Sequence, residues 1–342
     1  GLLDADGRDL PLRLDGEAEG PASAGDGTRM LELRQPVERF TFIGLELPEG
    51  ARPVPSLLRG FSAPVQVRYR YSDADLTFLM AHDSDGFNRW DAAQTLAQRL
   101  LLAMVEDPSL SVPNGFIDAF RRALLDEHGD KALLAEVLTL PSESYLGDQM
   151  SIVDVDGIHR ARETLAGTVG GVLRDELRSV YERNGEFGDY DLSSASMGRR
   201  ALRNRALGYL MQAPDADMLA LAQAQFDAGH NMTDVIAALR LLVDAPMPIA
   251  GDAGERALQT FYDRWSADPL VLDKWFALQA QASRSDTLER VEGLMGHPDF
   301  SLTNPNRVRA LIGAFAVGNP LRFHADDGGG YRFLAERVIE LD

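Results

Sequence analysis

The fold is decided at Val65-Gln66-Val67-Arg68-Tyr69-Arg70-Tyr71-Ser72-Asp73-Ala74-Asp75, where the spacing of apolar residues changes. From Val65 to Tyr71 apolar and polar residues alternate, which is typical of a half-buried β-strand. Ser72 then offers an N-cap hydroxyl, and Asp75 stands three positions later, a variant of the capping box that begins helices. The stretch therefore predicts β-structure before residue 72 and helices after it.

The residues before this point predict a small antiparallel β-sandwich. Short apolar runs occur at Met30–Leu33 and Phe40–Phe42, and Asp4-Ala5-Asp6-Gly7 is a turn signal between extended runs. Several short strands at such spacing are typical of small all-β domains. The span Asp15–Thr28 is rich in Gly, Ala and acidic residues, so we expect a surface loop there.

The residues after this point predict helices joined by short loops. Long amphipathic segments are expected at, among others, 155–183 and 304–317, and Pro, Gly, Asp or Asn marks the breaks between helices. The segments follow no strict repeat length, which favours an irregular array. The predicted fold class is mainly α. A small Ig-like antiparallel β-sandwich spans residues 1–71, and an irregular α-helical, ARM- or HEAT-like solenoid spans residues 72–342.

Composition excludes several classes of function. The 342 residues carry a net charge of −19, so we expect the protein to repel nucleic acid and anionic membranes. There is no cysteine, which excludes disulfides, thiolate catalysis and cysteine-ligated zinc and fits a reducing cytoplasm. No apolar run approaches the roughly 18 residues of a membrane span. The expected location is therefore the cytoplasm.

No local motif for catalysis or metal binding is present. The six histidines are at least 27 positions apart, whereas a zincin site needs two histidines one helical turn apart. There is no Gly-x-Ser-x-Gly elbow, although a triad assembled from distant residues leaves no such mark. Gly328-Gly329-Gly330 opens a predicted helix, where an anion site is an alternative to the favoured flexible turn and cap. We therefore predict no catalytic residue, metal ligand or bound cofactor in this chain.

The stretch Asn304-Pro305-Asn306-Arg307-Val308-Arg309 is the least ordinary in the sequence. Asn304 suits the N-cap and Pro305 suits the first helical position. Arg307 and Arg309 remain unexplained, because cations at a helix start oppose the macrodipole. Each needs a carboxylate partner or an anionic ligand, and the sequence leaves open a structural ion pair and a ligand-facing role.

Five separated blocks of the chain resemble the bacterial aminopeptidase N family, zinc metallo-aminopeptidases of the gluzincin clan. The blocks are Pro53–Val65, Phe87–Ala92, Asn231–Asp234, Asp273–Phe276 and Asn304–Arg309, the last followed by Phe323-His324-Ala325 and Gly330-Tyr331. They occur in the family's order over essentially the whole chain. The resemblance covers only the family's C-terminal part, because HExxH, its distal Glu ligand, GxMEN and the catalytic Tyr are absent. The chain is therefore expected to be truncated at both ends relative to the parent enzyme.

The resemblance implies a supporting role for this region. The parent would be a zinc aminopeptidase that removes N-terminal residues from peptides, with Zn2+ held in its catalytic domain. The region itself would be inactive and bind no zinc. It would cap the upstream catalytic domain, enclose an interior cavity and contact the C-terminal side of the peptide. Arg309 matches a channel-lining arginine of the family, and Asn306 and Arg307 beside it are the other candidate substrate-channel residues.

The expected partners are thus the catalytic domain of the same polypeptide and peptide substrates, with no nucleic acid and no membrane. An alternative stays open, in which the chain is a stand-alone interaction scaffold made of an Ig-like domain and an α-solenoid. The two hypotheses differ in whether the reading frame upstream of Gly1 encodes HExxH followed by Glu.

Overall fold

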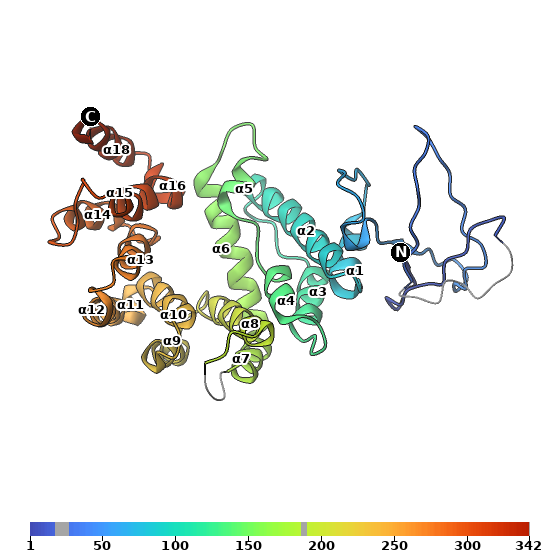
Figure 1. Ribbon diagram of the computed structural model, residues 1–342, viewed down its shortest axis with the longest axis horizontal. Coiled ribbons are helices and arrows are strands. Elements are labelled where there is room, and N and C mark those ends of the chain that lie inside the picture. The colour runs from blue at the N-terminus through green and yellow to red at the C-terminus, as the bar shows by residue number, and fades with distance from the viewer. Residues whose placement is uncertain (18–26, 186–189, 342) are drawn as a thin grey trace. The chain divides into compact units, whose positions relative to one another are not determined.

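The chain is described by a computed structural model that covers residues 1–17, 27–185 and 190–341 (Figure 1). It divides into two compact units, one of Gly1–Leu100 with Ser111–Leu140 and one of Leu101–Leu110 with Pro141–Asp342. Most described residues are helical, and β pairing occurs only near the N-terminus. The predicted class, mainly α with a small β part in front, is confirmed.

The β part of the first unit is smaller than predicted. Strands β1 (Leu2–Leu3) and β2 (Val54–Pro55) pair antiparallel. Isolated bridges join Leu3 to Asp9 and Leu14 to Phe42. The predicted loop Asp15–Thr28 lies mostly outside the described residues.

The strands predicted at Met30–Leu33 and Val65–Tyr71 are wrong, because neither segment pairs with a neighbour in the described structure. Val65, Val67 and Tyr69 are 46–59% exposed. Alternating apolar and polar residues are compatible with a β-strand, but a strand also needs a hydrogen-bonded partner and a buried face.

Helix α1 (Asp73–His82) begins at the predicted position. Ser72 Oγ accepts a hydrogen bond from the Asp75 N–H at 3.1 Å, and the Asp75 carboxylate accepts one from the Ser72 N–H at 3.1 Å. The predicted capping box is therefore confirmed. The other helices of this unit are the first part of α2 (Gly86–Glu106), α3 (Asn114–Leu124) and α4 (Lys131–Val137). The compact unit runs past residue 71 into these helices, and the domain boundary at Tyr71–Ser72 stays a prediction.

The second unit is helical throughout its described residues. Its helices after α2 are α5 (Glu143–Gly147), α6 (Val155–Val172), α7 (Arg174–Arg183), α8 (Ser194–Leu210), α9 (Ala216–Ala228), α10 (Met232–Asp244), α11 (Met247–Ala250), α12 (Ala253–Trp265), α13 (Pro269–Ala280), α14 (Thr287–Met295), α15 (Pro305–Val308), η2 (Arg309–Gly313), α16 (Ala314–Gly318), α17 (Pro320–Phe323) and α18 (Gly329–Leu341). Successive helices pack on one another, as in α7 on α8 and α9 on α10, and α17 returns to contact α6.

Two predicted helices differ from the structure. The segment 155–183 is two helices, because Leu173 leaves helical geometry with φ −106° and ψ 24°. The preceding Gly170 packs on a backbone carbonyl, since a Cβ there would lie 2.3 Å from Tyr209 O. The segment 304–317 is interrupted by η2, a π-helical turn. The short helices α5, α11 and α17 escaped prediction because four or five residues show no periodicity.

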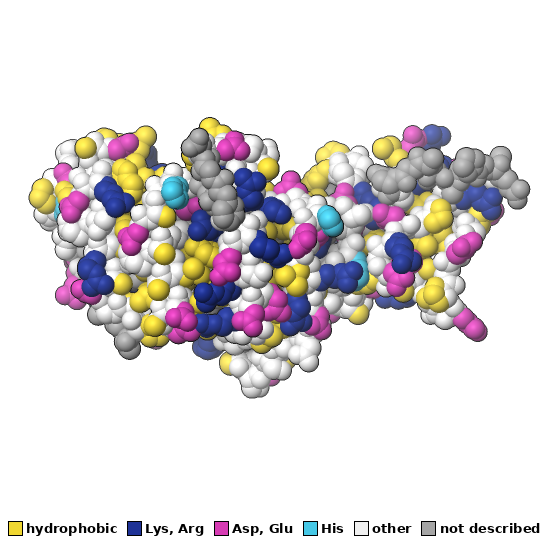
Figure 2. Space-filling view, turned by 90° about the horizontal axis from the view of Figure 1, so that it is seen from below, with side chains coloured by type: hydrophobic (Ala, Val, Ile, Leu, Met, Phe, Trp, Pro, Cys, Tyr) yellow, Lys and Arg dark blue, Asp and Glu magenta, His cyan; other side chains and the backbone are white. Residues whose placement is uncertain are grey.

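The surface agrees with a chain of mixed charge. Figure 2 shows acidic and basic side chains interspersed on the face drawn, with no large field of one sign. No helix within the described ranges is both long and apolar enough to cross a membrane.

Candidate functional site

The candidate site residues lie where a helix starts after Asn304. The Asn304 side-chain oxygen accepts hydrogen bonds from the N–H groups of Asn306 at 3.0 Å and Arg307 at 3.3 Å. Pro305 is the first residue of α15. These contacts satisfy two of the four N–H groups that a helix leaves unpaired at its start. Asn304 and Pro305 therefore serve as the predicted cap.

Arg307 points into the protein and is 6% exposed. Its guanidinium forms an ion pair with Asp273 and donates to the backbone oxygens of Asp299 at 3.1 Å and Pro269 at 3.3 Å. It also lies over the Phe276 ring, 5.3 Å from the centroid. The structural ion pair that the sequence left open is thus present for Arg307, and it fastens the start of α15 to α13.

Arg309 and Asn306 point the other way. Both are exposed, and they stand three residues apart, which places them on one face of the helix. The Arg309 guanidinium has no ion pair or hydrogen bond to any residue in the described ranges. The structure thus brings Asn306 and Arg309 together on the surface and separates Arg307 from them.

Arg309 also begins an irregular turn. Residues Arg309–Gly313 form the π-helical turn η2 between two α-helical segments, and its Leu311 and Ile312 are buried. Single π-helical turns within helices are rare and occur frequently at functional sites. The apolar pattern over 304–317 predicted a continuous helix, so this turn was not predicted.

The Gly318-Asn319-Pro320 break is a joint between helices. Asn319 is buried, and its side-chain amide donates to the backbone oxygens of Ala280 at 3.0 Å and Ala282 at 2.8 Å. It therefore ties the start of α17 to the end of α13, where those carbonyls would otherwise lack partners.

The Gly328-Gly329-Gly330 turn serves as a cap. The Gly329 N–H donates to the Asp327 carboxylate at 2.8 Å. The Asp327 side chain therefore caps the N-terminus of α18. Gly330 packs on a backbone carbonyl, since a Cβ there would lie 2.3 Å from Phe323 O. The favoured interpretation, a turn with a cap, agrees with these contacts better than an anion site does.

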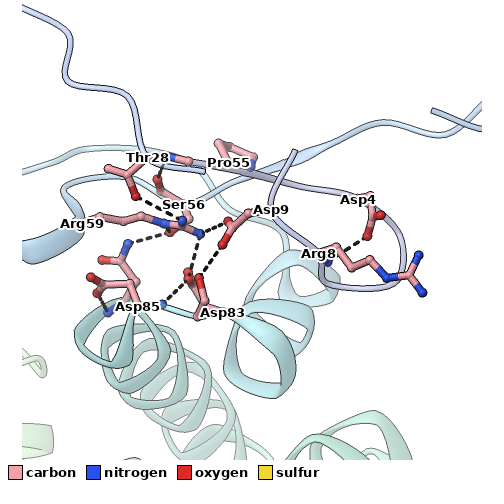
Figure 3. Close-up of polar contacts among 12 residues, drawn as sticks. Asp4, Arg8, Asp9, Thr28, Pro55, Ser56, Arg59, Asp83 and Asp85 are labelled. Atoms are coloured by element: carbon pink, nitrogen blue, oxygen red, sulfur yellow. Dashed lines mark hydrogen bonds and ion pairs between the residues drawn. The ribbon is translucent and has the colours of Figure 1, made fainter. Parts of the chain in front are cut away.

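A buried ionic cluster that sequence reasoning missed lies in the first unit (Figure 3). The Arg59 side chain is 5% exposed, and its guanidinium pairs with Asp9 at 2.7 Å and with the buried Asp83 at 3.2 Å. Its Nε donates to Ser56 Oγ at 2.7 Å. Burial raises the pKa of the Asp83 carboxyl. The cluster joins the N-terminal segment to the turn between α1 and α2, so we assign it to structure.

A second cluster joins α5 to α6. His159 Nδ1 lies 2.9 Å from a Glu143 carboxylate oxygen, and Arg162 lies 3.5 Å from the same oxygen. The hydrogen bond to Glu143 raises the pKa of His159. Burial opposes ionisation of Glu143, but its bonds to His159 and Arg162 outweigh burial and lower its pKa. Both shifts favour the charged forms of His159 and Glu143.

Among the described residues, no group of three or more His, Asp or Glu side chains is arranged to hold a metal ion. His159 and His324 contact other residue types instead. His159 bonds to Glu143, and His324 lies 2.6 Å from the Tyr331 hydroxyl.

Two family models match the chain. Residues 1–70 match a domain of unknown function with an Ig-like fold (DUF3458), and residues 73–342 match a domain of unknown function made of ARM repeats (DUF3458_C).

Curated relatives and a solved structure extend the comparison. The chain is 39% identical over its whole length to aminopeptidase N of Escherichia coli K12, covering 38% of that protein. It is 42% identical over 85% of its length to aminopeptidase N of Caulobacter vibrioides, covering 33% of that protein. A crystal structure of Legionella pneumophila aminopeptidase A in complex with aspartic acid matches 85% of the chain and 34% of its own, with a TM-score of 0.75 and 32% identity. The chain thus spans about two fifths or less of the length of these relatives.

Proposed function

The chain belongs to the family of paired DUF3458 Ig-like and ARM-repeat domains, and on that premise we propose that it is the C-terminal, non-catalytic region of a zinc aminopeptidase. The parent enzyme would remove N-terminal residues from peptides in the cytoplasm. Its zinc would belong to an upstream catalytic domain of the same polypeptide, as the resemblance to the aminopeptidase N family implies.

One observation carries this proposal: the whole chain aligns at 39% identity with aminopeptidase N of Escherichia coli. Identity at that level over 345 aligned residues supports a shared architecture. A stand-alone scaffold is less favoured, because nothing among the described residues points to it in particular.

The proposed task of the helical part is to cap the catalytic domain, enclose its interior cavity and hold the C-terminal side of the peptide. We assign the last of these tasks to Arg309. Its guanidinium is exposed and unpaired among the described residues, and a planar guanidinium binds a carboxylate through two parallel hydrogen bonds. Asn306 on the same face could donate a further hydrogen bond from its amide. Arg307 would act only by holding the helix in place.

The test compares two substrates in the enzyme that contains this chain. Arg309→Ala should raise KM for short peptides with a free carboxylate, by about 10-fold if one charge-assisted bond of roughly 1.5 kcal/mol is lost. Hydrolysis of an alanyl chromogenic amide, which lacks that carboxylate, should stay nearly unchanged. An unchanged ratio between the two substrates would retire the channel role. Absence of any aminopeptidase activity would retire the proposed function as a whole.

A further inference from the structure

Gly313, at the end of the π-helical turn, has no structural reason to be a glycine. Its φ of −64° is helical and open to any residue. A Cβ there would meet only Arg309 Cβ at 3.8 Å and Val308 O at 3.9 Å, which are ordinary contacts. Glycine is less favourable than alanine within a helix. The missing side chain is therefore explained neither by packing nor by backbone geometry.

Gly313 lies between two exposed side chains on one helical face. Arg309 precedes it by four residues and Val317 follows it by four, a spacing that keeps residues on the same face. Val317 is 84% exposed although it is apolar. At the α-helical rise of 1.5 Å per residue eight residues span about 12 Å, and the π-helical turn shortens this slightly, so Arg309 and Val317 lie roughly 10–12 Å apart along the helix. The surface between the cation and the apolar side chain is left open by Gly313.

Val317 lines a pocket. This pocket of about 230 Å³ is lined from one side by Val317, Pro320 and His324 and from the other by α5, α6 and the turn between them. Its apolar walls on the second side come from Val153, Val155 and Ile158. Sites for whole small molecules measure about 300–1,000 Å³, so this volume suits a single side chain.

The two ends of this surface differ in charge. At the pocket end the Glu143 carboxylate is already paired with His159 and Arg162, and Asp148 adds a second carboxylate. The other end carries the Arg309 guanidinium, which has no partner among the described residues. A ligand with one terminal carboxylate is therefore attracted to the unpaired cation at Arg309 rather than to the paired charges beside the pocket. The charge difference therefore fixes the direction in which such a ligand lies.

We propose that the surface from Arg309 over Gly313 to Val317 is a groove for the C-terminal part of an extended peptide. The terminal carboxylate pairs with Arg309, the backbone passes over Gly313, and an apolar side chain enters the pocket beside Val317. Extended chain advances about 3.3 Å per residue, so roughly 10–12 Å corresponds to three or four residues. The preferred substrates then carry an apolar residue three or four positions before the C-terminus. This inference rests on the proposed function and adds a substrate preference to it.

The test uses the enzyme that contains this chain and two hexapeptides, Ala-Gly-Leu-Gly-Gly-Gly and Ala-Gly-Ser-Gly-Gly-Gly, each as free acid and as amide. The wild type should prefer the leucine acid about 10-fold in kcat/KM, mostly through KM because the contact is remote from the scissile bond. Gly313→Leu, which blocks the path, and Val317→Asp, which charges the pocket entrance, should each reduce this preference below about 2-fold.

Gly293→Leu is the matched control, because Gly293 is an exposed glycine within α14 with no atom close to an added Cβ. It should keep the leucine preference, and melting temperatures verify that each variant is folded. Val317→Asp changes a surface side chain, so it tests the groove even if Gly313→Leu fails to fold.

Two contrary results are distinct. The groove is overturned if the wild type shows no preference for leucine, or if that preference survives both groove variants. In either case the proposed function still stands if the preference for acid over amide depends on Arg309. If Arg309→Ala leaves the preference for acid over amide unchanged, the channel role falls and the groove falls with it.

Discussion

Arg307 and Arg309 lie two positions apart on one helix, and their replacement by alanine should have very different effects on stability. Arg307→Ala removes a side chain that is 7% exposed and leaves the Asp273 carboxylate and two backbone oxygens without the guanidinium donor. Removing one partner of a buried ion pair costs about 3–5 kcal/mol. The Asp273 side chain is 20% exposed, so water can partly replace the lost contact, and we expect a loss near 3 kcal/mol.

Arg309→Ala is the matched control, because it removes the same side chain from an exposed position. Surface substitutions of this kind change stability by about 0.5 kcal/mol or less. In a helical unit of this size, 1 kcal/mol shifts the melting temperature by about 2–4 °C. Arg307→Ala should therefore lower the melting temperature by about 6–12 °C, and Arg309→Ala by about 2 °C or less.

Urea denaturation and thermal melting of the two variants measure the difference directly. A double-mutant cycle with Asp273→Ala identifies the source, because the double variant should lose clearly less than the sum of the two single losses. Equal destabilisation by Arg307→Ala and Arg309→Ala, or additive losses in the cycle, would refute the assignment of Arg307 to structure.

Three further outcomes follow from other contacts. Arg59→Met should destabilise the protein by about 3–5 kcal/mol in urea denaturation, because two acidic partners are left in a buried cluster; a loss below 1 kcal/mol would contradict this. The pKa of His159 is raised by Glu143, so its contribution is full below the unfolded pKa near 6.5 and is lost as pH rises through the folded pKa. The stability advantage of the wild type over His159→Gln should therefore shrink as pH rises above about 6.5, and a constant advantage over that rise would rule out the ion pair as its source. Gly330→Ala should cost about 1–3 kcal/mol through a clash with a backbone oxygen, whereas Gly293→Ala should be neutral or stabilising by up to about 1 kcal/mol; similar melting temperatures for both would argue against the close packing at Gly330.

Local signals in the sequence predicted local structure well. The capping box at Ser72 and Asp75 and the cap at Asn304 and Pro305 involve residues at most three positions apart, so the sequence alone contains both partners. The order of the helices followed from apolar periodicity and from breaks at residues such as Pro269.

Contacts between distant residues could not be predicted in the same way. Arg307 meets Asp273, 34 positions away, and Arg59 meets Asp83, 24 positions away. Which acidic residue serves each arginine depends on how helices pack, and helix packing has no local signal. The strand predicted at Val65–Tyr71 failed for the same reason, because its alternation is local whereas a β-ladder requires a distant partner.

The blocks that resemble the aminopeptidase N family contain mainly joints, meaning polar side chains that connect one structural element to another. Arg59 serves a buried ion cluster, Arg89 donates to the Met80 carbonyl at 2.9 Å, and Trp275 donates to the Leu258 carbonyl at 3.0 Å. Asp234, in α10, accepts from the Asn204 amide of α8 at 2.8 Å.

Each joint uses a polar side chain that has little freedom to change, because leaving its buried partner unsatisfied costs about 1–3 kcal/mol. A distinctive residue in such a block is therefore weak evidence for contact with a ligand. The stronger evidence is a residue that no such joint explains. Asn306 and Arg309 meet that criterion because they are exposed and their side chains have no polar partner among the described residues. The half-buried Gly313 on the same face meets it because the fold would accept a side chain there. For this reason the search for a peptide contact belongs at this face rather than at the more conspicuous buried Arg307.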